Sequence, residues 1–198
     1  MNRAPAGIDQ ETEEAAEEAA LIRRIAGGEP HLYGTLIDRH QRRLWWSCLR
    51  MLGDPDEADD VVQETFVRAW ERLGEFDPAH RFYAWVFTIA RNRCLNALRR
   101  RRTWGFRSLS SGDDPPAPDA GERTSAAAED RQLALALEEC MEGLPDEQRE
   151  AFELRHGEGL RYAEIAAALE VPEGTVMSRL HRARERMREC LEGKGHAP

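Results

Sequence analysis

Residues 160–188, LRYAEIAAALEVPEGTVMSRLHRARERMR, limit the fold of this chain more than any other segment. In their first part, apolar residues recur at three- and four-residue spacing, which places them on one face of a helix. Pro172 has no amide hydrogen and disfavours helix in the residue before it, so residues 170–172 should form a turn. Pro172 also suits the first position of a new helix, and Glu173 lies where a helix N-terminus favours negative charge. The segment therefore predicts two helices joined by a three-residue turn.

The second helix of this pair combines an apolar stripe with a polar leading edge. The stripe consists of Val176, Leu180, Ala183 and Met187. The leading edge consists of Thr175, Met177, Ser178 and His181, and arginines occupy much of the remaining surface. This is the layout of a DNA-reading helix-turn-helix, whose second helix lies in the major groove. Helix pairs with arginine-rich faces also occur in proteins that never touch DNA, so this segment alone leaves both interpretations open.

The net charge of the whole chain is negative, and only the local distribution of charge along the sequence supports DNA binding. The formal net charge is −9 at pH 7. Residues 1–20 hold six acidic residues and one arginine, and residues 107–130 hold six acidic residues and two arginines, which accounts for all of it. Positive charge is concentrated instead at residues 91–102 and 179–188. Such local clusters are what phosphate contacts require.

The pattern of the whole chain predicts an all-α protein. Helical periodicity predominates and alternating strand patterns are absent, so we expect two small helical bundles joined by a flexible linker. Residues 1–20 are acidic and alanine-rich; they could form a frayed helix but have little to pack against, which indicates a mobile extension. The first bundle should cover residues 21–102, and residues 103–130, rich in Pro, Gly, Ser and Asp, should form the linker. Residues 131–192 should form the helix-turn-helix bundle, followed by a tail at residues 193–198.

The segment DEADDVVQETFVRAWERL, residues 56–73, predicts an amphipathic helix in the first bundle. Its buried side should hold Val62, Phe66, Val67 and Trp70. Its exposed side should present Asp59, Asp60, Gln63, Glu64 and Arg68. On its own, this polar face is typical of ordinary solvation.

A further helix is expected over residues 81–102, with aromatic residues at its start and arginines and asparagines at its end. This combination suits single-stranded DNA, because bases stack on rings while arginines hold phosphates. Phe82, Trp85, Val86 and Ile89 also fit the core face of a bundle helix. We expect most of them to be core, with one or two ring edges available to a base.

The remaining signals concern chemistry and location. The cysteines Cys48, Cys94, Cys140 and Cys190 are widely spaced in apolar helical registers, which favours core packing in a reducing cytosol over a disulfide or a metal site. A signal peptide and an apolar run of membrane-spanning length are absent, so we expect a cytoplasmic protein without membrane insertion. The sequence offers no Ser/His/Asp grouping, phosphate-binding glycine loop or metal cluster. We therefore expect neither an enzyme nor a cofactor.

Two separated stretches resemble one family, the bacterial sigma factors. DDVVQETFVRAW, followed by FYAWVFTIARNRCLNALRRRR, resembles their region 2. LPDEQREAFELRHGEGLRYAEIAAALEVPEGTVMSRLHRARERMR resembles their region 4. With only a linker between the two, the chain looks like the extracytoplasmic-function (ECF) group of RNA polymerase sigma factors in the sigma-70 family. The resemblance implies an alternative sigma factor that binds RNA polymerase core enzyme and directs promoter recognition and opening in transcription initiation.

The resemblance also implies roles for individual residues. Asp60, Gln63 and Glu64 match positions that dock on the clamp helices of the polymerase β′ subunit. The minus-10 element would be captured and opened by Arg91, Asn92, Asn96, Arg99 and Arg100. The minus-35 element would be read by Thr175, Met177, Ser178, Arg179, His181 and Arg182, on a domain that also contacts the β flap. A partner anti-sigma factor that covers both domains is implied as well.

Two positions of the second helix depart from the family pattern. Met177 stands where relatives often carry lysine or arginine, and His181 where an aromatic residue is frequent. A methionine can touch a thymine methyl group but cannot make a bidentate hydrogen bond to guanine, so the minus-35 sequence is expected to differ from that of better-known relatives.

Two other functions compete with the sigma-factor interpretation. One is a stand-alone helix-turn-helix transcriptional regulator whose N-terminal bundle senses a ligand or dimerises. The other is an interaction adaptor whose arginine faces bind acidic partners. Binding to purified core polymerase would separate both from a sigma factor.

Overall fold

The computed structural model describes residues 6–78, 80–103 and 125–196, with side chains for residues 15–78, 80–101 and 131–196. Every regular element in these ranges is a helix, which confirms the all-α prediction. The chain divides into two compact units, Met1–Ser108 and Leu109–Pro198. Within the described ranges, no helix has both the length and the apolar character needed to cross a bilayer.

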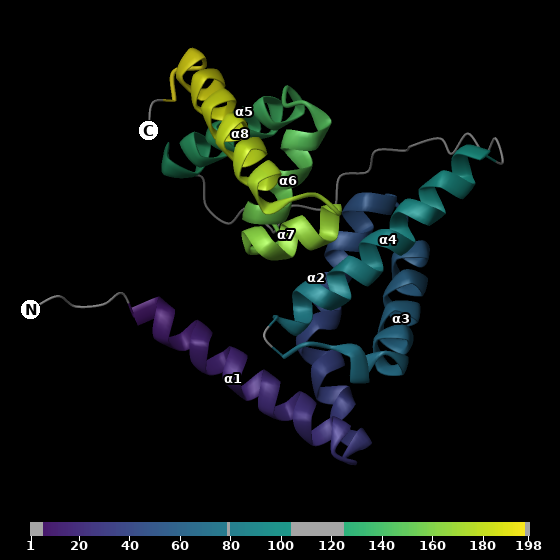
Figure 1. Cartoon of the computed structure of the whole chain (residues 1–198). Coiled ribbons are helices and arrows are strands. Elements are labelled where there is room, and N and C mark those ends of the chain that lie inside the picture. The colour runs from purple at the N-terminus through teal and green to yellow at the C-terminus, as the bar shows by residue number, and fades with distance from the viewer. Residues whose placement is uncertain (1–5, 79, 104–124, 197–198) are drawn as a thin grey trace, which may run out of the picture. The chain divides into compact units, whose positions relative to one another are not determined.

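In its described residues, the first unit contains four α-helices and two short 3-10 helices. Its elements are α1 (Ala6–Ala26), η1 (Pro30–Leu32), α2 (Tyr33–Leu52), α3 (Pro55–Glu71), η2 (Leu73–Glu75) and α4 (Phe82–Thr103). Helices α2, α3 and α4 pack against one another, as Figure 1 shows. Their shared core includes Leu36, Leu44, Phe66, Phe82 and Val86, all almost fully buried.

The turn between α2 and α3 follows from its sequence, Gly53-Asp54-Pro55. Gly53 adopts a left-handed conformation at φ 67°, which ends α2 without the steric cost that a Cβ atom would add. Asp54 is the N-cap of α3 and accepts a hydrogen bond from the Glu57 amide at 3.1 Å. Pro55 fills the first helical position, one residue before the predicted helical segment of residues 56–73.

Helix α1 differs from the predicted mobile extension. Residues 6–20 are helical and continue into Ile22 and Ile25, which are buried at 4% exposure each. Glu18 lies within the predicted extension but contacts both α2 and α4. The prediction failed for Glu18 because composition gave no sign that one acidic side chain of this run has buried partners.

The second unit contains α5 (Ser125–Glu142), α6 (Asp146–His156), α7 (Tyr162–Leu169) and α8 (Glu173–Gly193). Helix α8 packs against each of the other three. Its predicted stripe of Val176, Leu180, Ala183 and Met187 is buried, at 0–4% exposure. The helix-turn-helix is therefore held by the seam that the sequence predicts.

The turn between α7 and α8 comprises residues 170–172, as predicted. Glu170 adopts a left-handed conformation at φ 55°, and the Val171 amide donates to the Ala166 carbonyl at 3.1 Å, which closes the end of α7. Pro172 is the N-cap of α8 rather than its first helical residue. This difference of one position leaves the direction of α8 unchanged.

The predicted linker is shorter at its C-terminal side. Residues 104–124 lie outside the described residues, and α5 begins at Ser125, six positions before the predicted start of the second bundle. Ser125 is followed by Ala126, Ala127 and Ala128. Alanine has the strongest intrinsic helix propensity, so this run extends α5 backwards from its amphipathic part.

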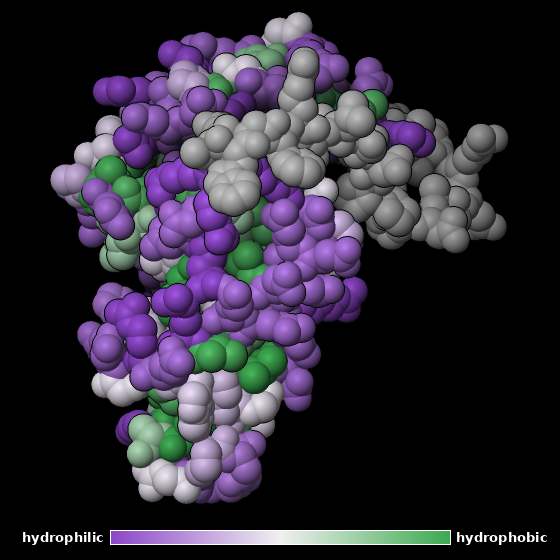
Figure 2. All heavy atoms as spheres, turned by 90° about the vertical axis from the view of Figure 1, so that its right-hand side faces the viewer, coloured by the Kyte–Doolittle hydropathy of each residue, from purple (hydrophilic) through white to green (hydrophobic). Residues whose placement is uncertain are grey.

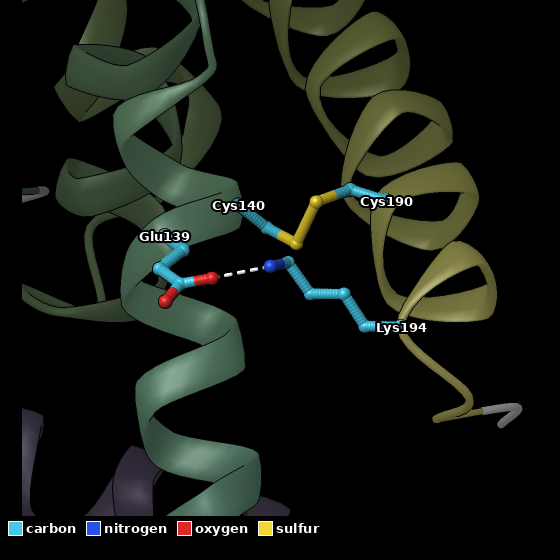
Figure 3. Close-up of a disulfide and its surroundings, with 4 residues drawn as sticks. All are labelled: Glu139, Cys140, Cys190 and Lys194. Carbon is cyan, nitrogen blue, oxygen red and sulfur yellow. Dashed lines mark hydrogen bonds and ion pairs between the residues drawn. A yellow bond between two sulfur atoms is a disulfide. The ribbon is translucent and has the colours of Figure 1, made fainter.

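The prediction that all cysteines are unbonded is wrong for the second unit. Cys140 of α5 and Cys190 of α8 form a disulfide with a Cα–Cα distance of 5.8 Å, shown in Figure 3. Lys194 and Glu139 form an ion pair beside it. Cys140 is also buried against Leu144, Ala183 and Met187, so it packs in the core as predicted and cross-links it as well. The bonded residues are 50 positions apart, and no local pattern pairs them.

Cys48 and Cys94, in contrast, are buried free thiols in the first unit. They belong to α2 and α4 and share a hydrogen bond, which lowers the pKa of the Cys94 thiol below its ordinary value. The prediction of core packing without a disulfide is thus confirmed for Cys48 and Cys94 and not for the other two described cysteines.

Candidate protein and nucleic-acid interfaces

The three residues predicted to dock on a partner lie on the exposed side of α3. Asp60, Gln63 and Glu64 are all exposed, while the opposite side of the helix buries Val62 and Phe66. Their spacing of three and four residues places them next to one another. Glu64 also forms an ion pair with Arg93 of α4, so part of its charge is engaged within the unit.

The same face of α3 carries two apolar side chains that were predicted to be buried. Val67 is 57% exposed and Trp70 is 42% exposed, so the prediction was wrong for both. The buried stripe of α3 is centred instead on Val61, Val62, Phe66 and small residues between them. The Trp70 ring packs against the Tyr33 ring in a tilted arrangement, at a centroid distance of 4.9 Å. The exposed face of α3 is therefore polar at its N-terminal part and apolar at its end.

The predicted minus-10 residues lie along the second half of α4. Asn92, Asn96, Arg99 and Arg100 are exposed, and Arg91 is half-buried. Arg99 donates from Nη1 to Oδ1 of Asn96 at 3.0 Å. Asparagine offers a donor and an acceptor to a base edge, and arginine offers charge to phosphates, so this strip has the chemistry for single-stranded DNA.

Not every arginine of this helix belongs to the exposed strip. Arg101 turns toward the protein, where Nε donates to Glu57 Oε1 at 3.0 Å and Nη1 donates to the Leu52 carbonyl at 2.9 Å. Arg93 turns toward Glu64. The local positive charge available to DNA is thus smaller than the arginine count suggests, because these two cations hold α3 and α4 together.

The aromatic start of α4 is mainly core, as predicted. Phe82 and Val86 are fully buried, whereas Trp85 and Ile89 are half-buried. Phe82 packs against Phe76 and Trp85 at centroid distances of 5.7 and 5.8 Å. Of these four residues, only the Trp85 ring has an edge that a base could reach.

The predicted minus-35 residues divide into exposed and anchored groups on α8. Met177 is 48% exposed, and His181 and Arg182 are also exposed. Thr175 and Ser178 are half-buried, and Ser178 Oγ donates to the Thr175 carbonyl at 2.9 Å. The structure therefore brings all six residues to the first turns of α8, with Met177, His181 and Arg182 the most accessible to a ligand.

Arg179 is the anchored member of this set. Its guanidinium pairs with Glu147 of α6 at 2.8 Å, and its side chain is only 17% exposed. A groove-reading role would require Arg179 to share its donors between Glu147 and DNA. The sequence gave no sign of this, because Glu147 is 32 positions away.

The rear of the helix-turn-helix is fixed by polar contacts between helices. Arg184 Nη2 donates to the Tyr162 hydroxyl at 3.0 Å, which ties α8 to the start of α7. Arg155 donates to the Leu160 carbonyl at 2.8 Å and stabilises the loop before α7. Burial, together with the neighbouring Arg184 and Arg155, lowers the pKa of His156. These contacts make the pair of helices a rigid unit that can present α8 as a whole.

The surface of the protein is mostly hydrophilic and carries small groups of apolar side chains. On the face turned to the viewer in Figure 2, hydrophilic side chains predominate and hydrophobic ones form only small separate groups. Among the described residues, the exposed large apolar side chains are Trp46, Val67, Trp70, Leu133, Leu135, Leu137 and Met177. Isolated apolar side chains are common on soluble surfaces, so only those beside predicted contact residues, Val67, Trp70 and Met177, carry functional weight here.

Comparison with known families gives two matches, one on each unit. Residues 36–103 match the family Sigma-70 region 2, and residues 134–187 match Sigma-70, region 4. The first match spans α2, α3 and α4, and the second runs from within α5 into α8.

Curated proteins show the same likeness over nearly the whole chain. The chain is 33% identical over 187 residues to the RNA polymerase sigma-H factor of Pseudomonas aeruginosa, covering 89% of this chain and 94% of that protein. It is 28% identical over 178 residues to the ECF RNA polymerase sigma factor SigW of Bacillus subtilis, covering 86% and 94%.

Solved structures include two similar chains. CnrH, in complex with the cytosolic domain of CnrY, has a TM-score of 0.56 and 28% identity, covering 88% of this chain and 97% of that chain. The sigma factor RpoE of Bartonella quintana, in complex with the anti-sigma factor NepR, has a TM-score of 0.56 and 27% identity, covering 81% and 96%.

Proposed function

This chain belongs to the sigma-70 family as an alternative sigma factor of the ECF group, and we propose that its two helical units divide polymerase binding and promoter contact between them. The first unit binds the β′ clamp helices of RNA polymerase core enzyme through α3 and the minus-10 strand through α4. The second unit reads the minus-35 duplex with α8 and contacts the β flap. The protein acts without covalent chemistry of its own, in the cytoplasm where the polymerase and the chromosome are.

One observation supports this proposal above the others: the two family matches fall on separate units of the same chain. A stand-alone helix-turn-helix regulator would account for residues 134–187 but not for the match over residues 36–103. An adaptor that binds acidic partners would account for neither. Gln63 on α3 and Asn96 on α4 are also exposed to solvent in the first unit, where a ligand can reach them.

The test is direct binding to purified core polymerase, measured by titration with labelled sigma factor. We expect tight binding by the wild-type chain and a loss of affinity of about tenfold or more for Gln63→Ala, since interface residues of this kind contribute 1–2 kcal/mol. Asp38→Ala, on an exposed part of α2, is the matched control and should bind normally. Glu64→Ala is less informative because it also breaks the pair with Arg93. A wild-type chain that does not bind core enzyme would refute the proposed function.

Promoter recognition is tested by run-off transcription with core enzyme on a library of genomic fragments. The expected result is a limited set of templates that share two short elements at fixed spacing. Equal amounts of transcript from every template would contradict sequence-specific recognition.

We also propose that an anti-sigma factor controls this chain. The likeness to the sigma factor RpoE, solved in complex with the anti-sigma factor NepR, and to CnrH, solved in complex with the cytosolic domain of CnrY, supports this. A two-hybrid screen with the full chain as bait should return a protein that, once purified, abolishes run-off transcription. Candidates that bind without inhibiting transcription would count against it.

A further inference from the structure

The acidic N-terminal helix makes one contact that its composition does not predict. Glu18 of α1 uses both carboxylate oxygens: Oε1 lies 2.7 Å from Nε2 of His40 on α2, and Oε2 accepts a hydrogen bond from the Phe82 amide at 3.3 Å. Both side chains are largely buried, with 15% of Glu18 and 14% of His40 exposed. Glu18 therefore joins three helices through one functional group.

The position of the Phe82 amide makes this contact more than a surface ion pair. Phe82 is the first residue of α4, and the first amides of a helix have no acceptor within the helix. A carboxylate at this end also interacts favourably with the helix dipole. A largely buried carboxylate is costly unless both oxygens are satisfied, and here each has a partner.

A second route connects the same residues through aromatic contacts. The His40 ring lies 5.6 Å from the Phe82 ring and 5.8 Å from the Tyr83 ring. Phe82 is fully buried and packs in turn against Phe76, which precedes α4. By holding His40, Glu18 also fixes the ring against which the first turn of α4 packs.

The other end of α4 is held in a comparable way. Arg101 donates to Glu57 on α3 and to the Leu52 carbonyl at the end of α2. The exposed strip from Asn92 to Arg100 lies between these two anchors. A helix of this length behaves as a rod, so the position of its ends determines where the strip points.

We propose that Glu18 is a positioning residue for promoter opening, which fixes the first turn of α4 and thereby orients the strip from Asn92 to Arg100 toward the minus-10 strand. This inference rests on the proposed function of α4. It gives part of the acidic N-terminal helix a task in DNA capture although that helix holds none of the residues assigned to DNA. Without Glu18, the Phe82 amide loses its acceptor and the start of α4 becomes free to fray.

The experiment uses the full-length chain and three variants, at a temperature well below the melting transition. Glu18→Ala removes both contacts, and Glu18→Gln keeps an oxygen acceptor of nearly the same shape. Glu17→Ala is the matched control, because Glu17 is the adjacent acidic residue and is exposed. All four proteins are compared as free chains and as holoenzymes with core polymerase.

The first measurement is amide hydrogen exchange of the peptide that covers residues 76–86. We expect Glu18→Ala to exchange on the order of fivefold faster there, the effect of losing about one hydrogen bond. Glu18→Gln should be intermediate, and Glu17→Ala should match the wild type. Unchanged exchange in Glu18→Ala would overturn the proposal, whatever α4 binds.

The second measurement is the affinity of each holoenzyme for a single-stranded minus-10 oligonucleotide and, separately, for a minus-35 duplex. Glu18→Ala should weaken oligonucleotide binding about fivefold while its affinities for core polymerase and for the duplex stay unchanged. Glu18→Gln should recover part of the loss. A purely structural role would instead lower all three affinities together with the melting temperature, and that result would overturn the proposal.

The two measurements also separate this inference from the function on which it rests. If the wild-type holoenzyme does not bind the oligonucleotide, the assignment of α4 to the minus-10 strand fails. If the wild type binds and Glu18→Ala binds equally well, the assignment of α4 stands and the role of Glu18 is refuted.

Discussion

Arg179 and Arg182 lie within one turn of α8, yet their surroundings give them different tasks. Arg179 is paired with Glu147 and is 17% exposed, whereas Arg182 is exposed. A side chain that holds two helices together contributes to folding, and one that faces solvent contributes only when a ligand arrives. Substitution of each arginine should therefore separate stability from DNA binding.

Arg182→Ala should weaken binding to a minus-35 duplex and reduce the salt dependence of that binding by about one unit of log–log slope, because one phosphate contact is lost. The melting temperature and the affinity for core polymerase should not change. Arg131→Ala, an exposed arginine of α5 outside the arginine cluster of α8, is the control and should leave the slope as in the wild type. A fall in melting temperature for Arg182→Ala would show that its effect on DNA comes from folding.

Met177 gives the second prediction about a single residue. Its side chain is 48% exposed on the leading edge of α8, where it can contact a thymine methyl group. Met177→Lys should shift the selected minus-35 sequence toward guanine at one position, by roughly 1–3 kcal/mol of discrimination. Selection of duplexes from a randomised pool by the two holoenzymes measures this. An identical selected sequence for both proteins would show that position 177 does not face a base.

At the scale of elements, the disulfide between Cys140 and Cys190 connects the first and last helices of the second unit. Its reduction should lower the free energy of unfolding of that unit by up to about 4 kcal/mol, since the bond closes a loop of 50 residues in the unfolded chain. Cys140→Ser with Cys190→Ser should be destabilised to a similar extent. The first unit, whose cysteines are free, should not respond.

Two spectroscopic signals separate the units in this experiment. All five tryptophans precede residue 105, so tryptophan fluorescence follows the first unit alone, while far-ultraviolet circular dichroism follows helices of both. With dithiothreitol, the fluorescence transition should stay in place and a circular dichroism transition should move to lower denaturant. If both transitions moved together, the two units would be unfolding as one, and the disulfide could not be assigned to the second unit alone.

The elements also show what a sequence can predict and what it cannot. Local signals were sufficient for the turn at residues 170–172, for the stripe of α8 and for the helix-turn-helix, because each depends on residues a few positions apart. Contacts across helices were missed, as with Arg179 and Glu147 or the disulfide. For Val67 and Trp70, the apolar character was read correctly but the side of α3 was not, since their neighbours on other helices decide which apolar residues are covered. The assignments to polymerase and promoter remain predictions, although most of the assigned residues are exposed to solvent and Arg179 is the anchored one.

At the scale of the whole molecule, charge is divided in a way that suits two separate contacts. Acidic residues are concentrated in residues 1–20 and 107–130, whereas the densest arginine clusters lie within residues 91–102, on α4, and residues 179–188, on α8. Negatively charged side chains repel the phosphates of DNA. The acidic segments should therefore disfavour non-specific wrapping of DNA and leave DNA binding to α4 and α8. The formal net charge of −9 is therefore compatible with a protein that binds DNA only when both helices are engaged.

If both units must engage one promoter, their covalent connection should strengthen binding beyond the sum of the parts. A protease site inserted between residues 104 and 124 would allow the holoenzyme to be cut after assembly. Cutting should reduce affinity for a promoter with both elements by roughly 10²–10⁴-fold, because the second contact is no longer intramolecular. Affinity for a duplex with only the minus-35 element should change little, and the uncut protein with the inserted site serves as the control. A cut holoenzyme that keeps full promoter affinity would mean that core polymerase, rather than the chain between the units, holds them together on DNA.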